Sequence, residues 1–205
     1  MLVRLLLFAA SIYTLNLLSS SYGVFGSPLY LNHTSDKYQV QFQYPAGWDL
    51  TEKSSRFDEG ADIQVHSYTP PSGIMIISYV NLSDTESSLG FDQLVYQLYK
   101  DNIDSDYSKE IKVIEQPSFL TIDGQRAGTF LYTSKDKYEE NAVKSAIQTW
   151  IVTPTPGQGY IIMFSTSPDN FDMPEVIEIR DHIIKSIKFL GVGNTTESNK
   201  PSRFD

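Results

Sequence analysis

Apolar and polar residues alternate strictly from Tyr38 to Tyr44. Two tyrosines, a valine and a phenylalanine alternate there with three glutamines. This period of two predicts a β-strand with one buried face and one polar face. The Pro45-Ala46-Gly47 sequence predicts a turn after this strand. Trp48 follows as a large side chain that is expected to pack back onto the sheet.

Two later segments, residues 74–80 and 160–164, are apolar on both faces apart from Ser78. A strand of this kind is expected inside a sheet, and the second is expected to lie centrally with a covering layer on each side. Turn-forming pairs such as Asp123-Gly124 separate the other apolar runs. Further strands are predicted at residues 63–69, 111–115, 119–122, 128–133 and 146–152.

Two segments have the 3.6-residue period of an amphipathic helix. The first covers residues 88–103, and its apolar stripe consists of Phe91, Leu94, Val95 and Leu98. In the second, Asp172 with Glu175 predicts a helix N-terminus, and Gly191 predicts the end. The stripe of this helix consists of Val176, Ile179, Ile183 and Ile187.

Seven or eight strands joined by hairpin-length connections, with one helix in mid-chain and one at the end, predict a mostly antiparallel sheet with helices on both faces. The fold class is therefore expected to be α+β, as an α/β/α sandwich. Residues 1–26 are predicted to be a signal peptide and 27–34 a polar lead-in. Residues 35–190 are predicted to form a single domain, and 191–205 a flexible tail.

The leader predicts export. Arg4 precedes the apolar run of residues 5–18, which is too short for a comfortable membrane span, so a cleaved signal peptide is favoured over an anchor. A secreted or extracytoplasmic protein is expected, with at most peripheral membrane association. The chain has no cysteine, which excludes disulfides and thiolate metal sites. The net charge of −9 and the absence of a Lys/Arg cluster argue against nucleic-acid binding.

Asp101, Asp104 and Asp106 form an acidic segment whose oxygen ligands suit calcium or another divalent cation. The segment lacks the glycine and glutamate of an EF-hand loop, so a solvated acidic loop stays the alternative. His33, His66 and His182 have no spacing typical of zinc. Three sequons predict glycosylation sites at the residues Asn32, Asn81 and Asn194.

No catalytic motif stands on the element that its chemistry requires. Gly-x-Ser-x-Gly, Ser-x-x-Lys and His-Glu-x-x-His were considered, and neither a catalytic nor a cofactor-binding residue is expected. Aromatic residues are numerous and would suit either core packing or the lining of a ligand groove. The candidates for such a groove are Trp48, Tyr79, Tyr96, Tyr99 and Trp150.

The order and spacing of four segments resemble the PsbP/Mog1-like family. These segments are the strand and turn of residues 38–48, the helix around 91–98, the hairpin of 122–127 and the ending of 183–189. The resemblance covers roughly residues 35–190 and implies an antiparallel α/β/α sandwich. Members of the family include a subunit of the oxygen-evolving complex, a Ran-binding factor and exported bacterial proteins. The resemblance therefore implies a non-catalytic accessory or binding domain.

The sequence thus favours an exported, non-enzymatic domain that binds a protein partner at the cell envelope. Loops that end a rigid sheet are the expected contacts, here at residues 51–61, 101–109 and 134–141. A module that binds a small ligand or a metal is the alternative, and an enzyme comes third.

Overall fold

The computed structural model describes residues 28–53, 62–104, 109–138 and 142–191. They form ten strands and four helices. The strands are β1 (Tyr30–Ser35), β2 (Val40–Pro45), β3 (Asp49–Glu52), β4 (Ile63–Ser67), β5 (Gly73–Asn81), β6 (Lys109–Ile122), β7 (Gln125–Asp136), β8 (Ser145–Thr155), β9 (Gln158–Thr166) and β10 (Lys188–Phe189). The helices are α1 (Asp84–Ser88), α2 (Phe91–Asp104), α3 (Pro168–Phe171) and α4 (Pro174–Ser186).

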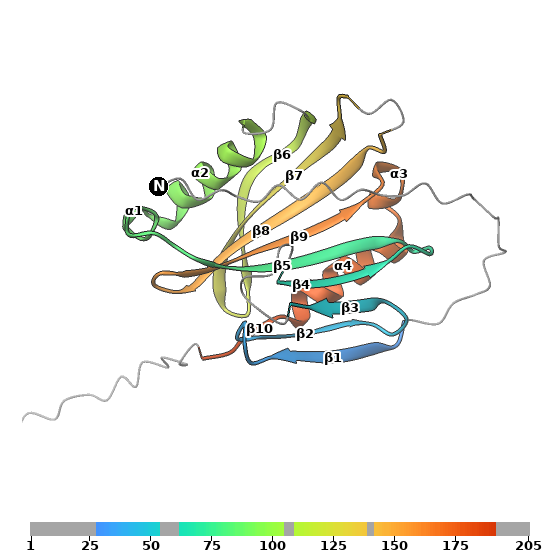
Figure 1. The fold of residues 1–205 in the computed structure, drawn as a ribbon, viewed down its shortest axis with the longest axis horizontal. Helices are drawn as coiled ribbons and strands as arrows, with labels where there is room; N and C mark the ends of the chain where they lie inside the picture. The colour runs from blue at the N-terminus through green and yellow to red at the C-terminus, as the bar shows by residue number, and fades with distance from the viewer. Residues whose placement is uncertain (1–27, 54–61, 105–108, 139–141, 192–205) are drawn as a thin grey trace, which may run out of the picture.

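The strands form two antiparallel sheets. A three-stranded sheet has the order β1-β2-β10, and a seven-stranded sheet has the order β3-β4-β5-β9-β8-β7-β6. In Figure 1, α4 lies behind β4 and β5, whereas α2 lies against β6 and β7. The predicted α+β class, with helices on both faces of a mostly antiparallel sheet, is confirmed. None of the described helices is long and apolar enough to cross a membrane.

The main core lies between the seven-stranded sheet, α4 and β2. The predicted stripe of α4 is buried in this core, and the helix ends at Ser186 with Ile187 as its C-cap. The predicted N-cap is wrong, because Met173 holds that place and Pro174 follows at the first helical position. The predicted end at Gly191 is also wrong. This glycine has a φ of 79° but follows β10.

A second core lies under α2 on the other face of the sheet. Leu94, Val95 and Leu98 pack there against Phe130 and Ile151. The predicted helix at residues 88–103 is confirmed with a shift of its start to Phe91.

Strand β6 corrects the prediction of two separate strands at 111–115 and 119–122. It is one strand with register shifts between Val113 and Ser118, and Pro117 within this part has no N–H to donate. The proline and the bulges hide the continuity of the strand from the sequence pattern. The tight turn at Asp123-Gly124 is as predicted, with φ of 50° and 75° at its two residues.

Two strands lie where polar segments predict none. Residues 30–34, within the predicted lead-in, belong to β1, which pairs with β2 along its whole length. Residues 51–52, within the predicted loop of 51–61, belong to β3. Both strands are half-exposed, and the apolar alternation that reveals a buried strand is weak in them.

Candidate functional site

One face of the seven-stranded sheet is covered by α4 and β2. Six apolar residues of β4, β5 and β9 on this face are at most 1% exposed, and they pack in one cluster with α4 and β2. These residues are Ile63, Val65, Met75, Ile77, Ile162 and Phe164.

The other face is covered over only part of its width. The helix α2 packs over β6 and β7, and its cluster extends to Ile147 and Ile151 of β8. Beyond β8, Ile74, Ile76 and Met163 belong to neither core cluster of the described residues. Within the part of the chain that the structure describes, no helix therefore lies over β4, β5 and the middle of β9 on this face.

We name this uncovered area the open face. Its residues lie opposite one another in the strand register, with Gln64 against Ile76, His66 against Ile74, and Ile76 against Met163. All are partly exposed, in contrast to the alternate residues of the same strands. The open face consists of Gln64, His66, Ile74, Ile76, Ser78, Met163 and Ser165.

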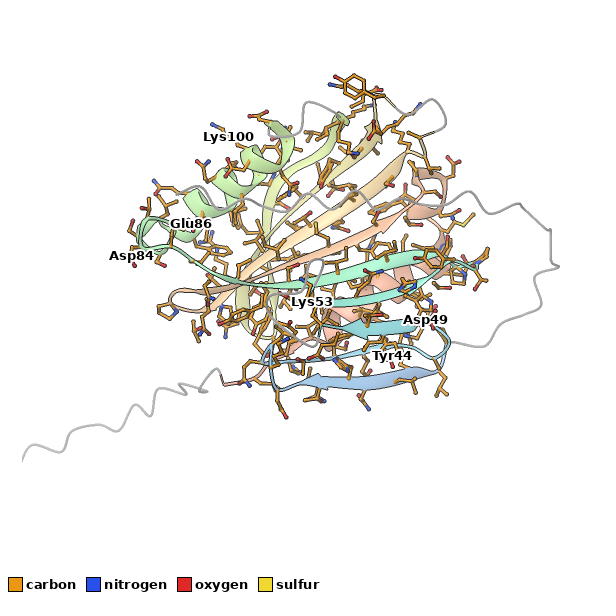
Figure 2. All side chains as sticks on the ribbon, viewed as in Figure 1. Tyr44, Asp49, Lys53, Asp84, Glu86 and Lys100 are labelled. Carbon is orange, nitrogen blue, oxygen red and sulfur yellow. The ribbon has the colours of Figure 1, made fainter. Side chains whose placement is uncertain are left out.

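The open face carries no Lys, Arg, Asp or Glu, although the whole chain has a net charge of −9. His66 is its one titratable group and lies toward the β3 side. Its Nε2 is 4.0 Å from a carboxylate oxygen of Asp49, and its ring is 4.7 Å from that of Tyr68. Figure 2 shows Asp49 near the start of β3, at this margin of the sheet.

The apolar side chains of the open face have amide, hydroxyl and imidazole groups around them, and such a surface is suited to contact with another protein. Interface cores are depleted in charged residues, and their polar rims supply hydrogen bonds. Three strands spaced about 4.8 Å apart leave a width of about one helix diameter, roughly 10 Å. The open face can therefore receive one secondary-structure element of a partner.

The three histidines have separate local roles. His33 Nε2 lies 2.9 Å from Glu52 Oε2 and so joins β1 to β3. His182 stacks on Tyr30 with 3.5 Å between ring centroids and hydrogen-bonds Gln43 across 2.8 Å. Among the described residues, no group of three His, Asp or Glu side chains converges as metal ligands would.

The acidic segment lies at the end of α2. Asp101 accepts a 2.8 Å hydrogen bond from Gln97, and Asp104 is the last helical residue. Asp106 lies outside the described residues. A calcium site at these three residues stays a prediction.

Two of the three predicted glycosylation sites are exposed on the structure. Asn32 lies on β1, and its Oδ1 accepts a hydrogen bond from Gln43. Asn81 is the last residue of β5. Asn194 lies outside the described residues, and glycosylation at all three stays a prediction.

The five aromatic residues considered for a ligand groove do not line a common surface. Trp48 and Trp150 are 8% and 3% exposed in the core beneath α4, and Tyr79 packs edge-on against Tyr160. On the opposite side of the sheet, Tyr99 packs against Phe130, and Tyr96 is 46% exposed. Core packing thus accounts for most of them.

The two tyrosines with the largest pKa shifts are core residues. Burial raises the pKa of Tyr132 to about 12, and burial with the neighbouring Tyr79 raises the pKa of Tyr160 to about 12. The Tyr160 hydroxyl donates to the backbone oxygen of Tyr38 across 2.8 Å, and that of Tyr132 donates to Asn102. These phenols remain protonated and link elements of the fold.

Of the loops predicted as contacts, residues 54–61, 105–108 and 139–141 lie outside the described residues. In the second loop, α2 continues to Asp104 and β6 begins at Lys109. In the third loop, the strand β7 continues to Asp136, and Tyr138 beyond it is 81% exposed. The open face was not predicted, because residues 74–80 and 160–164 are apolar on both faces and suggest cover on both. The signal that separates the faces is the register, which places polar Gln64 and His66 beside Ile76 and Ile74.

No protein-family model and no curated protein matches this chain. Solved structures do match. The cyanobacterial PsbP protein CyanoP of Synechocystis sp. PCC 6803 aligns with a TM-score of 0.58 and 19% identity, over 84% of this chain and 98% of CyanoP. LpqN of Mycobacterium tuberculosis aligns with a TM-score of 0.52 and 13% identity, over 80% and 91% of the two chains. The chain therefore has the PsbP-like fold.

Proposed function

We propose that this protein is an exported, non-catalytic accessory domain that binds a protein partner through the open face. The observation that carries the proposal is the uneven cover of the seven-stranded sheet. On one face, six apolar residues of β4, β5 and β9 are at most 1% exposed, whereas on the other face no helix of the described residues covers Ile74, Ile76 and Met163. Partly exposed apolar side chains without charges are typical of interaction surfaces.

An extracytoplasmic location is supported by two independent features. The first is the leader, with Arg4 before an apolar run that is too short to span a bilayer comfortably. The second is the fold, which this chain shares with CyanoP and with LpqN, a protein involved in cell envelope biogenesis. We therefore expect the partner at the cell envelope.

Site-directed photo-cross-linking tests the proposal. A photoreactive amino acid replaces Met163 on the open face in one variant and Lys185, which is 78% exposed on α4, in a matched control. Both proteins are produced in their native cells, irradiated, and read by mass spectrometry. We expect a defined protein adduct from position 163 that is absent from position 185.

A substitution on the same face completes the experiment. Ile76→Asp adds a charge beside Met163 and is expected to abolish the adduct while the protein stays folded. Equal adducts from both positions, or no adduct from position 163, would refute the open face as the binding surface.

A further inference from the structure

The outer edge of β6 is a second surface at which the protein could contact another chain. This strand ends the seven-stranded sheet and pairs only with β7 among the described strands. It also carries three large apolar side chains that are 37–50% exposed, namely Ile114, Phe119 and Leu120. A long edge strand with unpaired backbone groups and exposed apolar residues is a template for pairing with another strand.

Only the first part of this edge is regular. Residues Lys109 to Val113 follow an unbroken register with β7, from Lys109 opposite Asp136 to Val113 opposite Tyr132. Register shifts and Pro117 interrupt the strand beyond that point. Bulges and prolines protect an edge against pairing, so the five residues of the regular part are the available segment.

The charges of this segment select a register for pairing with a second copy. Two residues that lie opposite each other in an antiparallel pair have side chains on the same face of the sheet, and along one strand only alternate residues share a face. When both strands are copies of β6, one residue must therefore lie opposite its own copy. With Ile111 at the centre, Glu110 lies opposite Lys112 of the other copy, twice by symmetry. Moving the centre by one residue sets Glu110 against Glu110, or Lys112 against Lys112.

We propose that the protein forms a homodimer in which two β6 strands pair antiparallel about Ile111. Glu110 already lies opposite Lys135 of β7, so the pairing extends an alternation of charge across the sheet. The Ile111 side chain points to the α2 face, where it and Ile103 are partly exposed at the margin of the second core. A second copy would cover this margin, which adds apolar burial to the two ion pairs.

Sedimentation velocity over a range of concentrations tests the dimer, with charge reversals as matched variants. Lys112→Glu or Glu110→Lys alone places like charges opposite each other and is expected to raise the dissociation constant roughly tenfold or more. The combined Glu110→Lys, Lys112→Glu protein restores opposite charges and is expected to dimerise again. Both side chains are exposed, so the variants should fold, and circular dichroism checks this.

A cysteine probe tests the register itself. The chain has no cysteine, so Ile111→Cys supplies the one thiol, and residues directly opposite in an antiparallel pair are close enough for a disulfide. We expect a cross-linked dimer on mild oxidation of Ile111→Cys and none from Lys185→Cys. A protein that remains monomeric at about 100 μM, or charge reversals that leave the dissociation constant unchanged, would overturn the proposal.

Discussion

The contact between α2 and β7 can be tested at Gly128, which faces Val95 of the helix. A Cβ at this position would lie 2.5 and 2.6 Å from the two methyl groups of Val95. Carbon atoms in favourable contact are about 3.5–4.0 Å apart, so the overlap is about 1 Å. Val95 is fully buried in the second core and cannot turn toward solvent. Gly128→Ala should therefore strain the packing of α2.

The cost can be bounded from two opposing effects. One extra carbon in a well-packed core costs about 1–3 kcal/mol. Replacing glycine by alanine also restricts the unfolded chain, which stabilises by about 0.4–1 kcal/mol. We expect a net loss of about 1–2 kcal/mol from Gly128→Ala. A domain of this size has about 5–15 kcal/mol of stability, so the variant stays folded.

Urea denaturation followed by circular dichroism measures this loss, and a double-mutant cycle assigns it. Val95→Ala alone removes buried methyl groups and should cost about 2 kcal/mol. In the double variant the alanine at 128 meets a smaller neighbour, so the combined loss should fall below the sum by about 1 kcal/mol. Strict additivity, or a Gly128→Ala protein as stable as the parent, would refute the close packing of α2 on β7.

Three further predictions test other parts of the structure. Ile77→Asp, on the covered face, should unfold the protein or cost about 4 kcal/mol or more, whereas its partly exposed neighbour Ile76→Asp should cost about 1–2 kcal/mol in thermal melts. Equal losses would mean that both faces are covered. Gly124→Ala places a side chain at a φ of 75° and should cost about 1 kcal/mol in urea, and an unchanged midpoint would contradict the assigned turn. The pKa of Tyr160 is raised from 10.0 to about 12, so its contribution to stability is present below pH 10 and is lost as pH rises toward 12. Tyr160→Phe should weaken this decline, and an ordinary phenol titration of the folded parent near pH 10 would count against it.

The sequence predicts the fold class because its strongest patterns belong to buried elements. The alternation predicted for residues 38–44 holds from Val40, where β2 begins, and becomes its buried and polar faces, with Val40 and Phe42 fully buried. Tyr38 is also buried, but it lies in the turn before the strand. The stripes of α2 and α4 likewise become the two helix contacts with the sheet. In these elements the period of the apolar residues follows directly from the single face that each strand or helix buries.

The same period of apolar residues does not predict the edge strands. Strands β1 and β3 bury little, so polar residues such as Asn32 and Thr51 are tolerated and the period of two is lost. Register shifts and Pro117 divide β6 into two apparent strands. Pairing with a neighbour defines these elements, and a pattern along a single segment does not contain that information.

The open face cannot be predicted from the sequence for a related reason. Ile76 and Ile77 are adjacent and identical in type, yet one is fully buried and the other lies on the open face. Ile77 packs in the cluster with α4 and β2, whereas Ile76 belongs neither to that cluster nor to the one under α2, and both helices come from distant parts of the chain. The sequence therefore predicts contacts on loops, whereas the binding surface that we propose lies on the sheet itself.

The position of α2 also connects the two proposed surfaces. The helix lies over β6 and β7, so the open face remains on one side of it in the strand order and the free edge of β6 on the other. A two-fold axis through Ile111 would run perpendicular to the sheet, so pairing there would leave both open faces on the same side of one continuous sheet. Such a dimer would present two partner sites at once, and a partner with two copies of its contact would be held more tightly than either site alone allows. Lys112→Glu would then weaken the capture of a two-site partner but leave the affinity of each open face unchanged, which separates the dimer from the binding site by measurement.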